Sequence, residues 1–127
     1  MLCVGVCIRI DRDKFIALLT ERFPKIAASI DDVCARLLHL EMAVFAHATE
    51  AAMLAHEPEV VREHFDFAEE LLTQAAEDVD NAIYVSYLEL LPFESASWAT
   101  KLLPPKLRRA AGEMGVRLMS SGDAAEV

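Results

Sequence analysis

Apolar side chains recur every three or four residues through most of this chain, and that spacing is typical of helices rather than strands. Glycine is absent between Gly5 and Gly112, so the long middle of the chain lacks the turns that join short strands. The first helix is predicted to begin near Asp11 and to end at or beside Pro24. Its apolar positions are Phe15, Leu18, Leu19 and Phe23.

A long helix is predicted next, beginning at a capping pattern in which Ser29 is followed by Asp32. It carries two adjacent apolar stripes, and together they make a face broad enough to pack on more than one neighbour. The first stripe is Val33, Leu37, Leu40, Val44 and Ala51. The second stripe is Leu38, Met42, Phe45, Thr49 and Met53.

Prolines mark the helices that follow. Pro58 suits the first turn of a helix, whose apolar positions are Val61, Phe65, Ala68, Leu72 and Ala75. The helix predicted over residues 79–91 is apolar nearly all round, so we expect it at the centre of the fold, with Pro92 ending it. A short helix over residues 95–103 contains Trp98, and a basic helix then runs to about Met114.

These elements predict an all-α fold of five to six helices, arranged as an orthogonal bundle or as a HEAT-like stack of helix hairpins. A length of 127 residues suits one domain with one core. We expect a single helical domain over residues 11–116 and a flexible polar tail over residues 117–127. Residues 1–10 form an apolar lead-in, and the pattern leaves their structure open.

Composition and charge argue against several classes of protein. A chain that is 54% hydrophobic is expected to fold rather than stay disordered. The net charge of −9 argues against nucleic acid and anionic membranes as partners, because both attract clustered Lys and Arg. The apolar run at the start, eight residues long, is too short to span a membrane. Three cysteines in apolar surroundings favour the reducing cytoplasm over secretion, and they are Cys3, Cys7 and Cys34.

The pattern points to no catalytic residue, no metal ligand and no cofactor. His47 and Glu50 stand in the reverse order to the Glu-x-x-His motif of di-iron bundles. Ser86 lacks the flanking glycines of a nucleophile elbow, and inside a helix its hydroxyl is expected to bond to its own turn. Cys34 lies close to acidic residues, which disfavour a reactive thiolate.

Nearly all of the excess negative charge lies between Glu57 and Asp80. This stretch has nine carboxylates and one base, Arg62, so it holds eight of the nine net negative charges. Such a run is commonly only a solvated helix face. However, like charges three or four residues apart destabilise a helix, and a cost without local neutralisation also fits a basic protein partner, so both interpretations stay open. The residues predicted to bind that partner are Glu59, Glu63, Asp66, Glu70, Asp78 and Asp80.

Four segments resemble, in the same order, a family of small helical bacterial proteins that is largely uncharacterised. They are residues 39–42 (HLEM), 62–69 (REHFDFAE), 81–89 (NAIYVSYLE) and 102–108 (LLPPKLR). The resemblance covers about residues 11–115 and brings no catalytic motif with it. Some members resemble immunity proteins encoded beside secreted antibacterial toxins, so the resemblance implies a role in neutralising a toxin.

The leading hypothesis is therefore a non-enzymatic, cytoplasmic immunity protein whose acidic helix binds and occludes a cognate toxin. The alternative is a helical adaptor or homo-oligomeric scaffold, including a homodimer, that uses an exposed apolar patch around Phe93 and Trp98. A small helical enzyme with an unrecognised pocket is the third hypothesis. A toxin gene beside this gene favours the first, a tight homodimer the second, and a deep polar cleft the third.

Overall fold

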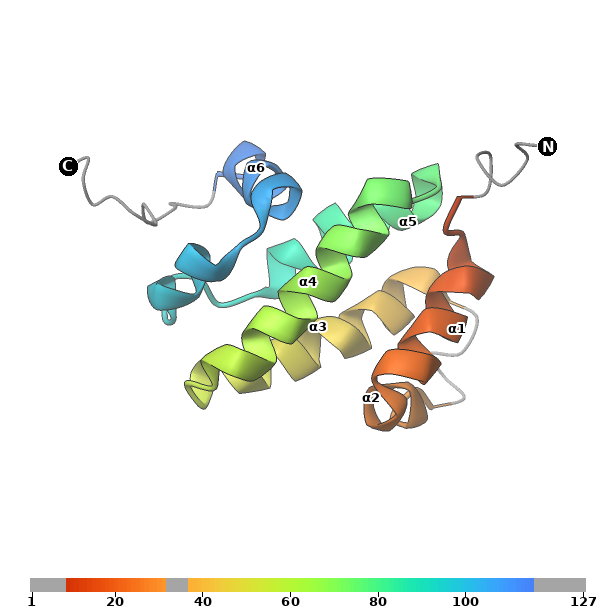
Figure 1. Cartoon of the computed structure of the whole chain (residues 1–127), viewed down its shortest axis with the longest axis horizontal. Coiled ribbons are helices and arrows are strands. Elements are labelled where there is room, and N and C mark those ends of the chain that lie inside the picture. The colour runs from red at the N-terminus through yellow and green to blue at the C-terminus, as the bar shows by residue number, and fades with distance from the viewer. Residues whose placement is uncertain (1–8, 32–36, 116–127) are drawn as a thin grey trace.

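The computed structural model describes residues 9–31 and 37–115, and the regular elements within those ranges are all helices (Figure 1). The predicted all-α class is confirmed. Cys3, Cys7, Cys34 and the predicted tail lie outside the described residues. The elements are α1 (Arg12–Arg22), α2 (Pro24–Ala28), α3 (Leu38–Leu54), α4 (Pro58–Gln74), α5 (Glu77–Ser86), η2 (Leu88–Leu90), η3 (Ser97–Leu102) and α6 (Pro105–Glu113).

The helices α3 and α4 form a hairpin joined by residues 55–57, and the other elements pack around it (Figure 1). Helices α1 and α2 lie on one side of α4, whereas η3 and α6 lie on its other side. Helix α5 returns along α3. Each helix except α2 contributes fully buried or nearly buried side chains to one core. The largest of them are Tyr87, Phe15, Phe45, Phe65 and Phe67.

His56 makes the turn between α3 and α4 in a backbone conformation that non-glycine residues rarely adopt, with a φ of 58°. The backbone N–H of His56 donates to the carbonyl of Met53 at 3.1 Å, and that of Glu57 donates to the carbonyl of Ala52 at 2.9 Å. These two bonds form a Schellman cap. The His56 ring also stacks on Trp98 at 4.3 Å between ring centres, so the turn is tied to η3.

The long helix α3 begins later than its predicted start. Its N-cap is Leu37, which is extended and provides no side-chain cap. Ser29 lies instead at the end of α2, where its hydroxyl donates to the carbonyl of Ile26 at 2.7 Å. The capping prediction at Ser29 was therefore wrong, because the hydroxyl closes the preceding helix. Asp32, the other half of that pattern, lies outside the described residues.

The helix predicted over residues 79–91 is divided in two. Helix α5 ends at Ser86, and Tyr87 leaves the helical conformation with φ −121° and ψ −67° before the short η2. The prediction that this helix lies at the centre of the fold is correct for one side of it only. Val79 and Ile83 are fully buried, whereas Val85 is 46% exposed. An apolar stretch thus carries both a core face and an exposed apolar face.

Ile10, assigned from the pattern to the lead-in, belongs to the core. It is 5% exposed, and its N–H donates to the carbonyl of Gln74 at 2.8 Å. The N–H of Ala76 donates back to the carbonyl of Ile10 at 2.8 Å. The segment before α1 is therefore hydrogen-bonded to the residues that connect α4 and α5.

Candidate interaction surfaces

The outer side of α4 carries an acidic surface made of Glu59, Glu63 and Asp66, which we call the acidic face. These three side chains are exposed, because the opposite side of α4 packs into the core through residues such as Val61 and Phe65. Within the described residues, none of the three carboxylates takes part in an ion pair or a hydrogen bond. Three of the six predicted site residues thus share one exposed stripe, and the exposed Arg62 on the same helix forms no ion pair with them.

Glu70, the fourth predicted residue on α4, is compensated within the chain. Its carboxylate forms an ion pair with Arg22 at the end of α1. The guanidinium of Arg22 also lies 5.4 Å from the centre of the Phe67 ring, which is within the range of a cation–π contact. Sequence spacing along α4 gave no sign of this pair, because the two residues are 48 positions apart.

Asp78 and Asp80 lie on α5 rather than on α4. Both belong to the first turn of α5, where a negative charge is favoured by the helix dipole. Asp78 is exposed and accepts a hydrogen bond from the N–H of Val79 at 2.8 Å. Asp80 is half-buried and lines an open concavity of about 520 Å³ together with Arg9 and Glu77. The structure thus separates these two residues from the acidic face.

Glu69, on the side of α4 next to α6, caps that last helix. Its two carboxylate oxygens accept hydrogen bonds from the backbone N–H groups of Lys106 at 3.0 Å and Leu107 at 2.7 Å. Pro104, the N-cap residue of α6, has no side-chain cap to offer. The basic helix is therefore docked on α4 through its backbone amides, and the carboxylate meets the positive end of the helix dipole.

A buried polar network joins α3, α4 and the residue after α5. The Thr49 hydroxyl lies 2.8 Å from Nδ1 of His64 and 2.9 Å from the Tyr87 hydroxyl. The Thr49 hydroxyl has one proton and two acceptors within reach, Nδ1 of a neutral His64 and, at 3.3 Å, the carbonyl of Phe45. The shorter contact favours donation to His64, with Tyr87 donating to Thr49. The rings of Phe23 and Phe45 pack on the imidazole at 5.0 Å and 5.3 Å between centres.

Burial governs the ionisation of this network. His64 is 4% exposed, and desolvation lowers its pKa from 6.5 to about 4. Desolvation also raises the pKa of Tyr87, although its hydrogen bond with Thr49 acts in the opposite direction. Because the three groups are sealed in the core, they hold the helices together rather than meet a substrate. Sequence analysis assigned Thr49 to an apolar stripe and so missed its partners.

Ser86 and His39 form a second interhelical contact, with Oγ and Nδ1 2.7 Å apart. The hydroxyl therefore bonds to α3, whereas its own turn was the predicted partner. Ser86 is only 9% exposed and ends α5. The negative end of the helix dipole lies there and disfavours a nucleophilic alkoxide. The pair is best explained as a tie between α3 and α5.

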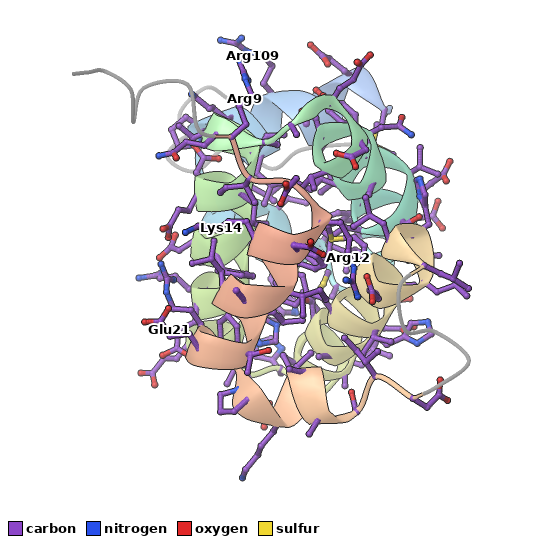
Figure 2. The ribbon with its side chains drawn as sticks, turned by 90° about the vertical axis from the view of Figure 1, so that its right-hand side faces the viewer. Arg9, Arg12, Lys14, Glu21 and Arg109 are labelled. Carbon is purple, nitrogen blue, oxygen red and sulfur yellow. The ribbon has the colours of Figure 1, made fainter. Side chains whose placement is uncertain are left out.

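A third interhelical contact is the ion pair between Arg12 of α1 and the buried Glu41 of α3. The Nε atom of Arg12 donates to one carboxylate oxygen at 2.9 Å, and Nη2 contacts the other oxygen. This pairing raises the pKa of Arg12. Figure 2 shows Arg12 on the side of α1 that faces α3, with Lys14 on the other side. Glu41 is 1% exposed, so the contact is structural.

The predicted apolar patch around Phe93 and Trp98 is only partly exposed. Phe93 is 7% exposed, and Trp98 is half-buried against His56. The exposed apolar surface lies instead on the outer side of α3, which we call the α3 face. Its apolar residues are Leu37, Leu40, Ala43, Val44, Ala51 and Leu54, and the exposed His47 lies among them. The described chain thus offers two candidate interaction surfaces, the acidic face and the α3 face.

Comparison with known proteins gives a family and no activity. A family model described as Domain of unknown function (DUF7674) matches residues 16–114. Neither a curated protein nor a solved structure matches the chain. Among the described residues there is no cluster of three or more His, Cys, Asp or Glu that could hold a metal ion. In the same residues no helix has both the length and the apolar character needed to cross a membrane.

Proposed function

We propose that this chain, which belongs to the DUF7674 family, is a protein-binding domain that docks a basic partner on the acidic face of α4. The partner in this proposal is a bacterial toxin, and the chain is its immunity protein in the cytoplasm, without catalytic activity. The choice of a toxin rests on the resemblance of four segments to proteins of that kind. The choice of surface rests on the charge of α4.

The observation that carries the proposal is the uncompensated charge of Glu59, Glu63 and Asp66. Repulsion between like charges at this spacing costs an isolated helix a few tenths of a kcal/mol per pair. The neighbouring carboxylates of Glu69 and Glu70 are used inside the chain, by α6 and by Arg22. The three remaining charges are therefore the ones available to an outside partner.

An uncompensated field of this kind acts mainly on the rate of association. It attracts a surface of opposite charge over a distance of about one Debye length, roughly 8 Å at physiological salt. A basic cleft on the partner would be covered by α4, which would exclude a negatively charged substrate from that cleft. Steric and electrostatic occlusion would thus act together.

The test compares the wild-type chain with the triple variant Glu59→Lys, Glu63→Lys, Asp66→Lys. The probe is the purified toxin-domain protein encoded beside this gene, and the measurement is the association rate by stopped-flow fluorescence at several salt concentrations. We expect the variant to associate at least roughly tenfold more slowly at low salt. Its rate should also depend less on salt.

The matched control places the same charge change elsewhere, as Glu21→Lys, Glu89→Lys, Glu94→Lys. These side chains are exposed and lie off α4. We expect the control to keep most of the wild-type rate. Equal losses of association rate in both triple variants would show that net charge alone controls the rate. An unchanged rate in the α4 variant would show that the acidic face is not the binding surface. Absence of binding by the wild-type chain would reject the toxin.

A further inference from the structure

We propose that the α3 face is the interface of a homodimer, in which two copies of α3 pack antiparallel about a two-fold axis at His47. This inference is independent of the proposed function, because it uses another helix and another kind of contact. The occupant is a second copy of this chain. Three observations support it: the exposure of the face, its lack of charge and its symmetry.

Three of the six exposed large apolar side chains in the described residues lie on α3 or at its N-cap, and the others are Val60, Val85 and Leu90. Leu37, Leu40 and Leu54 are 51%, 42% and 59% exposed. Ala51 is also exposed, and Val44 is half-buried. Isolated exposed leucines are ordinary, but apolar side chains that recur along one exposed side of a helix are typical of an interaction site, and on α3 only His47 interrupts them. The second predicted stripe of α3, which includes Met42 and Phe45, is the buried one.

The face is almost uncharged on a strongly acidic chain. The charged residues of α3 are Glu41 and Glu50. Glu41 is buried against Arg12, and Glu50 is half-buried at the edge of the face. Two copies with a net charge of −9 each repel one another. They can meet with least repulsion where neither contributes a row of carboxylates, and α3 offers such a side.

Five residues along the middle of the α3 face have the same order in both directions from His47. The stripe Leu40, Ala43, His47, Ala51, Leu54 has steps of three, four, four and three residues. In an antiparallel pair with the two-fold axis at His47, each residue faces the one equally far on the other side. Leu40 then meets Leu54 of the second copy, and Ala43 meets Ala51. At the edge of the stripe, Val44 meets the half-buried Glu50 of the second copy. Such self-complementarity is what a two-fold interface requires.

Small and large side chains suit close packing in this register. Alanines on both sides of the axis allow the helices to approach to about 8–10 Å, while the leucines at the two ends cover each other. The contact between His39 and Ser86 brings the end of α5 next to the start of α3. Val85 and Leu90, which are 46% and 42% exposed, lie on that neighbouring segment.

The size of the face predicts a reversible dimer. Helix α3 has 17 residues and is therefore only about 26 Å long. A standard interface buries roughly 800 Å² on each partner, so the surface next to α3 has to contribute as well. We expect the population of the dimer to rise with concentration rather than to be complete at all concentrations.

The first test is sedimentation velocity of the full chain from micromolar to millimolar concentration. We expect the average mass to rise from one copy toward two copies. Ala51→Arg puts a long charged side chain on the exposed face and should leave the chain folded but monomeric. Thr73→Arg, on the exposed side of α4, adds the same charge and should dimerise at least as well as the wild type.

Circular dichroism of both variants shows whether the fold is kept. A wild-type chain that stays monomeric over the whole concentration range would overturn the proposal. This holds whether the α3 face is then exposed to solvent or binds a different protein. An Ala51→Arg variant that dimerises as the control does would also overturn it. The variant with three lysines on the acidic face should still dimerise, so a failed toxin experiment leaves this one intact.

The second test measures the register through single cysteines in a chain whose Cys3, Cys7 and Cys34 are changed to serine. His47→Cys lies at the axis and should form a disulfide with its own copy on mild oxidation. Leu54→Cys lies seven residues from the axis, so its sulfur is roughly 21 Å from its own copy. It should cross-link only when mixed with Leu40→Cys. Equal self-cross-linking at positions 47 and 54 would contradict the antiparallel register.

Discussion

His64 makes the stability of this protein depend on pH through its burial. Its pKa is about 4 in the folded chain and about 6.5 in an unfolded chain. Between these values the unfolded state binds more protons than the folded state, so the free energy of unfolding falls as pH falls. From about pH 7 to about pH 5 this contribution decreases by about 2 kcal/mol. It is fully present above the unfolded pKa.

Urea unfolding at the two pH values measures this prediction. His64→Phe removes the titrating group while keeping a ring among Phe23 and Phe45, so its stability should change less with pH than that of the wild type. The control variant His47→Gln removes an exposed histidine instead. Measured in dilute solution, where the chain is monomeric, its stability should depend on pH as that of the wild type does. Parallel pH profiles for the wild type and His64→Phe would show that His64 is not the group responsible.

His56 combines an unfavourable backbone conformation with a favourable ring contact. Its positive φ costs a non-glycine residue about 1 kcal/mol or more, while an aromatic pair such as the one with Trp98 contributes about 0.5–1.5 kcal/mol. His56→Gly should therefore stay close to the wild type in stability, because it loses the stack but relieves the backbone. His56→Ala loses the stack and keeps the strain.

Thermal unfolding followed by Trp98 fluorescence tests this order of stability. We expect His56→Ala to be less stable than His56→Gly by about 1 kcal/mol. The emission of Trp98, the only tryptophan in the chain, should change in both variants because the imidazole is lost. If the alanine variant were as stable as the glycine variant, the backbone of this turn would carry no strain.

At the level of helices, Glu69 connects α4 to α6 through a carboxylate cap. Glu69→Ala leaves the N–H groups of Lys106 and Leu107 without their acceptor, and loss of a helix cap costs about 0.5–2 kcal/mol. We expect that loss in chemical unfolding, together with faster amide exchange at the start of α6. Glu63→Ala, from the exposed face of the same helix, should leave both unchanged. Normal exchange in α6 of the first variant would rule out the cap.

The helices that sequence analysis placed best are those with strong local signals. Pro58 and the one-sided apolar pattern defined α4, since both act within a few residues. The start of α3 was missed because the Ser29 hydroxyl can bond either to the helix before it or to a helix after it, and in the structure it bonds to α2. The two stripes of α3 are equally apolar, so periodicity alone did not show that Met42 faces the core while Leu40 faces solvent.

The candidate site shows the same limit. Exposure of Glu59, Glu63 and Asp66 follows from helical spacing. The ion pair of Glu70 with Arg22 does not, because it joins residues from different helices. Local sequence thus gives the position of a charge on its helix, whereas packing between helices decides whether that charge is compensated.

Over the whole molecule, the acidic face and the exposed apolar face lie on different helices of one hairpin, α4 and α3. Helices α3 and α4 contact each other through Thr49 and His64, and their exposed sides, the α3 face and the acidic face, lie away from that contact. A dimer built on α3 would therefore leave two acidic faces open to partners. Because one contact is apolar and the other is ionic, salt should affect them in opposite directions.

Raising sodium chloride from about 0.1 M to about 1 M shortens the Debye length from about 10 Å to about 3 Å. Repulsion between two copies with a net charge of −9 is then screened, so the dimer formed through the α3 face should become tighter. Binding of a basic partner to the acidic face should become weaker, since the attraction between opposite charges is screened as well. Sedimentation of the chain alone and titration with the partner, both over this range, measure the two constants. A dimer that dissociates as salt rises would mean that ionic contacts hold it, which contradicts an apolar interface on α3.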